Sequence, residues 1–166
     1  SQIVIGNGTG YFNPAAGILL APGFTPNAIA AADFNLDATL DLAVAASGSN
    51  VVMIFLGNGA GGFTWTGSTI SVGNTPTSIG VGVWNGDGIL DLAVGNTNSD
   101  SLTLLQGNGS GGFTPSSGYY FGSGTRPRFV AVGDGEHRLG PQLLRGGVGG
   151  ARLRAQLVAE VPVDEH

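Results

Sequence analysis

The stretch Gly57-Asn58-Gly59-Ala60-Gly61-Gly62-Phe63 decides the fold, because it occurs three times along the chain at a nearly constant spacing. Closely similar stretches occupy residues 6–12 and 107–113, which begin 51 residues before it and 50 residues after it. Asn-Gly pairs accept the positive φ angles that tight turns between antiparallel strands require. Each copy therefore predicts a hairpin turn, and the spacing predicts a structural repeat of about fifty residues.

Two further markers recur in the same register. Pro26, Pro76 and Pro127 each precede a short apolar run, and Leu40-Asp41-Leu42-Ala43-Val44 is matched at residues 90–94. Short apolar runs separated by turn signals are typical of strands. Each repeat then contains an apolar strand, an aspartate-rich turn, a Leu-Asp-Leu-Ala-Val strand, a third strand, the Gly-Asn-Gly turn and a more polar fourth strand. Four antiparallel strands in about fifty residues form one blade of a β-propeller.

Composition supports a turn-rich β protein with a single core. The chain has 166 residues, 31 of them glycine, and only 10% are charged, too few for a coiled coil or a solvated helical bundle. Cysteine is absent, and no apolar run approaches the roughly 20 residues of a membrane span. Residues 1–125 carry aspartates and no lysine or arginine. We therefore expect no nucleic-acid partner, because nothing in that region could neutralise phosphate.

The aspartate-rich turn of the first full repeat has the oxygen donors of a cation-binding loop. Asp33, Asn35, Asp37, the carbonyl of Thr39 and Asp41 stand at alternate positions. Ca²⁺ takes six to eight oxygen ligands, whereas Mg²⁺ prefers to keep water in a strict octahedron. The pattern predicts a Ca²⁺ site; the alternative is a plain turn made by Asx side chains.

The second copy of this loop keeps most of the donors. Asn85, Asp87, the carbonyl of Ile89 and Asp91 remain, while Val83 replaces the first aspartate. Fewer carboxylates predict weaker Ca²⁺ binding.

The aromatic residues at position 2 of the two loops, Phe34 and Trp84, are expected to point into the core. A role for Trp84 in stacking on a ligand is the less favoured alternative.

These residues resemble the FG-GAP or VCBS repeats of integrin-α-like β-propellers, whose blades carry a calcium loop of the pattern D-x-[DN]-x-D-G-x-x-D followed by Leu-Ala-Val. The resemblance covers about residues 1–134 and implies the same Ca²⁺ ligands as above. Ala38 stands where the family favours glycine, and Val83 stands where it has aspartate. Members are mostly exported or cell-surface proteins that serve in adhesion, in sugar binding or beside a catalytic domain.

The fold class we expect is an all-β, partial β-propeller of four-stranded antiparallel blades, with the calcium loops between first and second strands. Two blades are too few to close a ring. The chain is therefore expected to be a fragment of a longer propeller or to complete a ring by homo-oligomerisation. The expected units are a partial blade at 1–22, blades at 23–73 and 74–123, the start of another at 124–134, and an aberrant arginine-rich tail at 135–166.

The tail departs from the repeat just after Asp134, and two explanations compete. Residues 151–161 could form a short helical cap with Leu153, Leu157, Val158 and Val161 along one side. Alternatively the coding frame slips, since a shifted reading of the codons for residues 135–138 permits Val-Asn-(Ile/Thr)-Asp and restores the loop pattern. We favour the slip, which sequencing of the encoding DNA would test.

We expect the chain to be a non-catalytic module, extracellular or on the cell surface, that binds a protein or glycan ligand or acts as a scaffold. Both histidines, His137 and His166, lie in the tail, so the repeats offer no histidine base. The alternative is an accessory propeller of a polysaccharide-degrading enzyme whose catalytic residues lie outside this chain. Trp65, Tyr119 and Tyr120 could stack on sugar rings, although such aromatics more often pack between blades.

Overall fold

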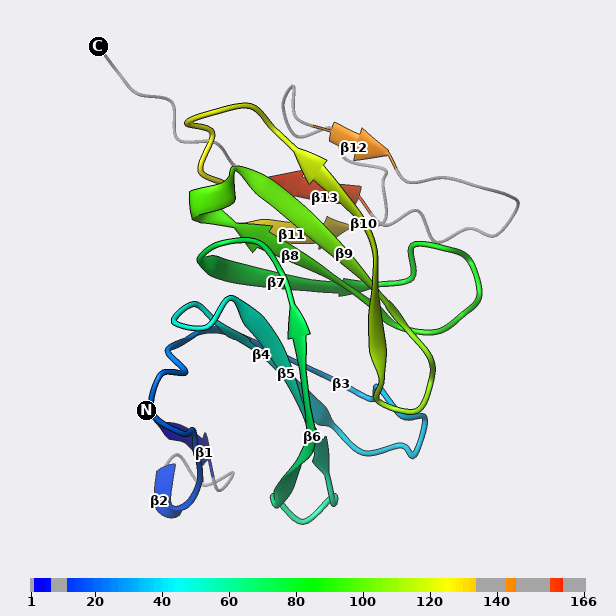
Figure 1. Cartoon of the computed structure of the whole chain (residues 1–166). Helices are drawn as coiled ribbons and strands as arrows, with labels where there is room; N and C mark the ends of the chain where they lie inside the picture. Colours follow the sequence, from blue (N-terminus) through cyan, green and yellow to red (C-terminus); the bar gives the residue numbers. More distant parts are fainter. Residues whose placement is uncertain (1, 7–11, 134–142, 146–155, 160–166) are drawn as a thin grey trace.

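The computed structural model describes residues 2–6, 12–133, 143–145 and 156–159, and strands dominate them (Figure 1). The prediction of an all-β chain is confirmed. The elements in chain order are β1 (Gln2–Gly6), β2 (Phe12–Leu19), β3 (Pro26–Ala32), β4 (Asp41–Ala46), β5 (Val51–Gly57), β6 (Phe63–Ser71), β7 (Pro76–Gly82), β8 (Asp91–Asn96), η1 (Thr97–Ser99), β9 (Ser101–Gly107), β10 (Phe113–Tyr120), β11 (Val130–Gly133), β12 (Leu143–Arg145) and β13 (Gln156–Ala159).

Two four-stranded antiparallel sheets correspond to the two full sequence repeats. The first repeat sheet has the order β3-β4-β5-β6 and the second repeat sheet has the order β7-β8-β9-β10. Their registers match, with Ile29 opposite Val44 in the first sheet and Ile79 opposite Val94 in the second. The predicted four antiparallel strands per repeat are therefore confirmed. The second strand of each sheet begins at the aspartate and not at the preceding leucine, which lies in the loop.

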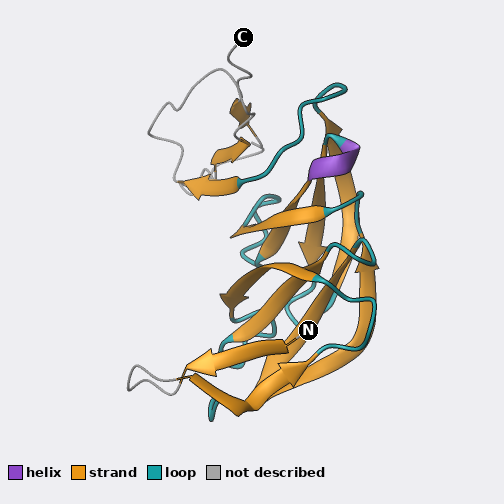
Figure 2. Cartoon of the chain, turned by 90° about the vertical axis from the view of Figure 1, so that its left-hand side faces the viewer, coloured by secondary structure: helices purple, strands orange, loops and turns teal. Residues whose placement is uncertain are grey.

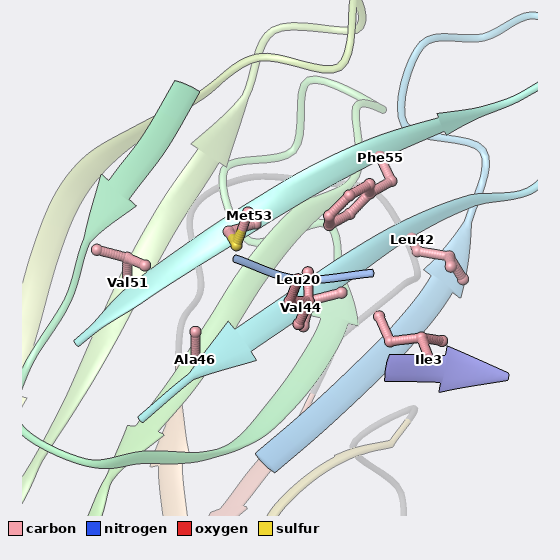
Figure 3. Packing of buried hydrophobic residues seen from close by; sticks show 8 residues of the cluster. All are labelled: Ile3, Leu20, Leu42, Val44, Ala46, Val51, Met53 and Phe55. Carbon is pink, nitrogen blue, oxygen red and sulfur yellow. The ribbon is translucent and has the colours of Figure 1, made fainter. Parts of the chain in front are cut away.

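The two sheets lie one on the other, and β1–β2 and β11 lie on their outer sides (Figure 1; Figure 2 shows the stack from the side). Apolar side chains fill three successive layers. The layer between β1–β2 and the first repeat sheet, drawn in Figure 3, contains Ile3, Leu20, Leu42, Val44, Ala46, Val51, Met53 and Phe55. The layer between the two repeat sheets contains Phe34, Ala43, Val52, Ile54, Leu92, Val94 and Leu105. A smaller layer on the far face of the second sheet contains Ala93, Leu102 and Val130.

The second strand of each repeat sheet, β4 and β8, is buried on both faces. In β4, Val44 points to the outer layer and Ala43 to the layer between the sheets, and both are fully buried. The same holds in β8, where Val94 and Ala93 point to opposite layers. Each fully buried valine or leucine side chain contributes roughly 1.5–3 kcal/mol. The Asp-Leu-Ala-Val segments that begin β4 and β8 thus lie at the centre of the stack.

In the C-terminal part of the chain, the described residues form a three-stranded antiparallel sheet. β11 pairs with β13, and β13 pairs with β12. The helix considered for residues 151–161 is therefore wrong at residues 156–159, where the backbone is extended and hydrogen-bonded to β11. Asp134, residues 135–142, 146–155 and 160–166 lie outside the described residues. The frame slip remains a prediction.

Candidate functional site

The first half of the loop at residues 33–41 is closed by hydrogen bonds from its own backbone. The Asp33 carboxylate accepts from the backbone N–H of Asp37 at 3.1 Å and from that of Ala38 at 2.8 Å. The Asn35 side-chain oxygen accepts from the same Asp37 N–H at 3.1 Å. Oxygen-bearing side chains at alternate positions therefore face the inside of the turn.

The Asp37 carboxylate has partners on both of its oxygens. Oδ1 accepts from the backbone N–H of Thr39 at 2.7 Å and from the Thr39 hydroxyl, and Oδ2 accepts from Asn35 Nδ2 at 2.8 Å. The Thr39 hydroxyl above all, then the Asn35 amide and the Thr39 N–H, lower the pKa of Asp37 below its ordinary value. This exposed carboxylate is thus held ionised, which is the state that a cation requires.

The backbone of this loop is strained at two positions. Leu36 and Ala38 have φ angles of 64° and 67°, in the left-handed region that L residues seldom adopt. The equivalent residues of the second loop are Gly86 and Gly88, with φ angles of 80° and 81°. Glycine adopts this conformation without a Cβ clash, so the first loop carries strain that the second avoids.

The aspartate at position 9 is oriented differently from the others. Asp41 is fully buried; its Oδ2 accepts from the backbone N–H of Phe34 at 2.9 Å and its Oδ1 accepts from that of Gly57 at 2.8 Å. Both oxygens therefore serve the backbone of two other segments.

The same arrangement occurs at the end of the second loop. Asp91 is also fully buried and accepts from the backbone N–H groups of Trp84 and Gly107, each at 2.9 Å.

The second loop repeats the short hydrogen bonds of the first but lacks those of Asp33. Asn85 Nδ2 donates to Asp87 Oδ2 at 2.8 Å, the Asp87 N–H donates to Asn85 Oδ1 at 3.0 Å, and the Ile89 N–H donates to Asp87 Oδ1 at 2.8 Å. Val83, at position 1, has no carboxylate to accept from the loop backbone. The second loop therefore has one carboxylate fewer that could bind a cation.

In the described part of the chain, no three carboxylate or histidine side chains converge as a metal site would require. Asp33, Asn35 and Asp37 nevertheless each place a side-chain oxygen in one short turn, and oxygen ligands are what Ca²⁺ prefers. The oxygen atoms of the first loop thus fit a hard cation such as Ca²⁺, and those of the second loop fit such a cation less well. The ligand sets predicted for residues 33–41 and 85–91 remain predictions.

Phe34, at position 2 of the first loop, joins this loop to the second repeat. Its ring is 3% exposed and meets Phe113 edge to face, with centroids 5.4 Å apart and an interplanar angle of 82°. Its carbonyl accepts from the backbone N–H of Gly111 at 3.0 Å. Phe34 therefore points into the core.

Trp84, the counterpart of Phe34 in the second loop, is only partly buried. It packs against the layer that contains Leu102 and Val130. Its indole Nε1 is buried without a hydrogen-bond partner among the described residues.

The three aromatic residues considered for ligand stacking are exposed but are not brought together. Trp65 is 43% exposed and pairs in register with Phe55, close to the Gly-Asn-Gly turn of the first sheet. Tyr119 and Tyr120, exposed by 40% and 66%, lie at the opposite end of the equivalent strand in the second sheet. The Trp65 indole N–H donates to the Ser68 carbonyl at 3.2 Å. A role in ligand binding stays a prediction for each of them separately.

Two polar residues that the sequence analysis did not single out link successive repeats. Asn50, in the turn between β4 and β5, accepts through Oδ1 from the backbone N–H of Thr75 at 2.8 Å. At the equivalent turn, Asp100 accepts from the backbone N–H groups of Arg126 at 2.7 Å and Gly124 at 2.8 Å. The Arg126 N–H first, then that of Gly124, lower the pKa of Asp100. The spacing of fifty residues between Asn50 and Asp100 is the signal that could have revealed the pair.

The asparagines of the Gly-Asn-Gly turns are also fixed by hydrogen bonds. Asn58 Oδ1 accepts from the N–H groups of Ala60 and Gly62, both at 2.9 Å. Asn108 Oδ1 accepts in the same way from Ser110 at 2.9 Å and Gly112 at 3.0 Å. The predicted turns are therefore built around an asparagine side chain as well as around positive φ angles.

The chain is an all-β repeat protein built from stacked four-stranded antiparallel sheets. Each sheet has an aspartate loop after its first strand and a Gly-Asn-Gly turn after its third. The sequence matches the FG-GAP-like repeat over residues 33–94 and 84–134, which is more than half of the chain. The protein belongs to the FG-GAP-like repeat family. No curated protein and no solved structure matches it. Among the described residues, no helix has the length and apolar character needed to cross a membrane.

Proposed function

We propose that the two repeat sheets are blades of a β-propeller, and that the chain acts as a calcium-binding segment of an extracellular or cell-surface binding or scaffolding module. The observation that carries this proposal is the stack of two sheets with the same strand order and register, packed face to face through a shared apolar layer. Blades of a propeller pack in this way. Membership of the FG-GAP-like family supports the same conclusion.

A stack of two blades needs further blades to close a ring, since propellers have four to eight. We propose that these come from a longer parent chain or from other copies of this chain. The two outer sides of the stack support this, because among the described residues the sheets there, β1–β2 and β11–β13–β12, have fewer strands than a repeat sheet.

Calcium, in this proposal, is held by the first aspartate loop. Asp33, Asn35 and Asp37 would supply side-chain oxygens, and Thr39 would supply its carbonyl. A bound Ca²⁺ would neutralise carboxylates that otherwise repel each other in a short segment. The second loop, with Asn85, Asp87 and the Ile89 carbonyl, would bind more weakly because Val83 supplies no charge.

The module is proposed to bind a protein or a glycan and to have no catalytic activity of its own. All six carboxylates of the described residues accept hydrogen bonds in the loops or at the links between repeats: Asp33, Asp37, Asp41, Asp87, Asp91 and Asp100. They therefore have structural partners, which supports a scaffold more than a pair of catalytic acids.

Thermal unfolding with added Ca²⁺ and with EDTA tests the calcium part of the proposal. The melting temperature should rise in Ca²⁺, and the Asp33→Asn variant should lose most of that rise because a charged donor is removed. Asp100→Asn serves as the matched control, since Asp100 lies outside both loops and its variant should keep the full rise. A melting temperature that is the same in Ca²⁺ and in EDTA would remove the metal from the proposal.

A glycan array and a pull-down with extracellular proteins test the binding part. The Trp65→Ala variant is the natural companion, because Trp65 is exposed and contributes no side chain to the buried layers. If the wild type binds a glycan or protein and the Trp65→Ala variant binds it more weakly, the ligand lies near the first repeat sheet.

A further inference from the structure

The aspartates at position 9 of the loops, Asp41 and Asp91, differ from the other loop aspartates in burial and in partners. Each is fully buried, and each accepts two backbone hydrogen bonds from two separate segments. For Asp41 these segments are the start of the loop and the end of β5, whose N–H donors lie 7 and 16 residues away. One carboxylate thus ties together three parts of the repeat.

Glycine at the end of the third strand is what allows this contact. A Cβ on Gly57 would lie 2.1 Å from the carbonyl oxygen of Leu40, and a Cβ on Gly107 would lie 2.1 Å from that of Leu90. Real Cβ atoms never approach an oxygen so closely. The missing side chain lets the glycine N–H reach the aspartate that follows the leucine.

A buried carboxylate is costly unless charge-assisted hydrogen bonds compensate for lost hydration. The backbone N–H groups of Phe34 and Gly57 supply that compensation to Asp41. The side chains of Asp33 and Asn35, in contrast, hydrogen-bond only within residues 33–38. Closure of the repeat and binding of a cation therefore depend on different members of the predicted ligand set.

We infer that Asp41 and Asp91 are closure residues, which hold their repeats together with or without a bound cation, and that Gly57 and Gly107 are required for this closure. The two repeats show the same bonds and the same close approach independently. The closure role stands apart from the proposed calcium binding; only the division of labour with Asp33, Asn35 and Asp37 rests on that proposal.

The test compares Asp41→Asn with Asp37→Asn in thermal unfolding, each in EDTA and in Ca²⁺. Asparagine keeps one oxygen but turns an NH₂ group toward a backbone N–H, so one buried hydrogen bond is lost. The melting temperature of Asp41→Asn should fall by about 5–10 °C already in EDTA. Asp37→Asn should lower the melting temperature in EDTA by less than Asp41→Asn, because Asp37 is exposed, and it should lose the rise that Ca²⁺ gives to the wild type. If Asp41→Asn melts like the wild type in EDTA, closure by Asp41 is refuted.

A measurement on the wild type decides the matter if Asp41→Asn does not fold. Amide hydrogen exchange in EDTA should find the N–H groups of Phe34 and Gly57 strongly protected, and much more so than the N–H of Ala60, which donates to Asn58 in an exposed turn. Exchange of Phe34 and Gly57 as fast as Ala60 would overturn the inference. A wild type that does not respond to Ca²⁺ while these amides are protected would refute the calcium proposal and leave the closure role intact.

A double-mutant comparison tests whether Gly57 is required for closure by Asp41. Gly57→Ala should lower the melting temperature in EDTA, and combining it with Asp41→Asn should add much less than the sum of the two single effects, because both remove the same contact. Full additivity would contradict the requirement for glycine.

Discussion

Replacing Phe34 by alanine should be among the most damaging single changes to this chain. Its ring is 3% exposed, packs in the layer between the two repeat sheets, and meets Phe113 edge to face with centroids 5.4 Å apart. Truncating a buried phenylalanine costs about 3–5 kcal/mol, and the lost aromatic pair accounts for about 0.5–1.5 kcal/mol of it. We expect a loss of about 4 kcal/mol, a large share of the roughly 5–15 kcal/mol that stabilises a typical domain.

Urea unfolding followed by circular dichroism measures this loss, with the free energy of unfolding extrapolated to water. Leu40→Ala is the matched control, because Leu40 lies in the same loop but is 62% exposed. That control should change stability by no more than about 0.5 kcal/mol. Packing of the two repeat sheets through Phe34 is refuted if Phe34→Ala costs less than about 1 kcal/mol, or no more than the Leu40 control.

Three further changes test the loops and the link between repeats. Ala38→Gly should stabilise the chain by roughly 0.5–1 kcal/mol in urea unfolding, because a residue at φ 67° loses its Cβ clash; a loss would contradict strain at Ala38. Asp100 has a lowered pKa in the folded chain, so its contribution to stability is present above the unfolded pKa of about 3.9 and disappears as the pH falls through the lower folded value. The melting temperature of Asp100→Asn, measured at a series of pH values, should therefore fall less at acid pH than that of the wild type. If both fall equally, Asp100 does not contribute to the acid sensitivity. Val83→Asp should tighten Ca²⁺ binding by the second loop about tenfold in titration calorimetry, whereas no gain would argue against that loop as a calcium site.

The strands and turns could be read from the sequence because local signals define them. The Gly-Asn-Gly turns, the prolines before the first strands and the Leu-Asp-Leu-Ala-Val runs each act within a few residues, and the structure has strands where they predict them. Phe34 could be assigned to the core by the same reasoning, since an aromatic residue beside a polar loop has few other favourable positions.

The orientation of Asp41 could not be read in this way. Spacing within the loop places it as the last of several cation donors, but one of its hydrogen-bond partners is Gly57, which lies 16 residues further along the chain. That contact depends on how the third strand returns to the loop, and a linear pattern does not contain this information. Asp100 was missed for a related reason, because its partners Gly124 and Arg126 belong to the next repeat.

The C-terminal segment shows a different limit. Leu157 and Val158 fit a helical apolar side as well as an extended strand, and the sequence pattern favours neither over so short a stretch. The backbone of β11 provides hydrogen-bonding groups, and β13 pairs with them. Tertiary pairing therefore decides the conformation of these residues.

The strand order has a consequence for how the chain folds. In both repeat sheets, strands that lie next to each other in the sheet are consecutive in the sequence, from β3 to β6 and from β7 to β10. Pairings of short sequence separation close small loops, which lowers the entropic barrier to folding. We therefore expect each repeat to form as a unit during synthesis, and each finished sheet to offer the next one an apolar surface on which to assemble.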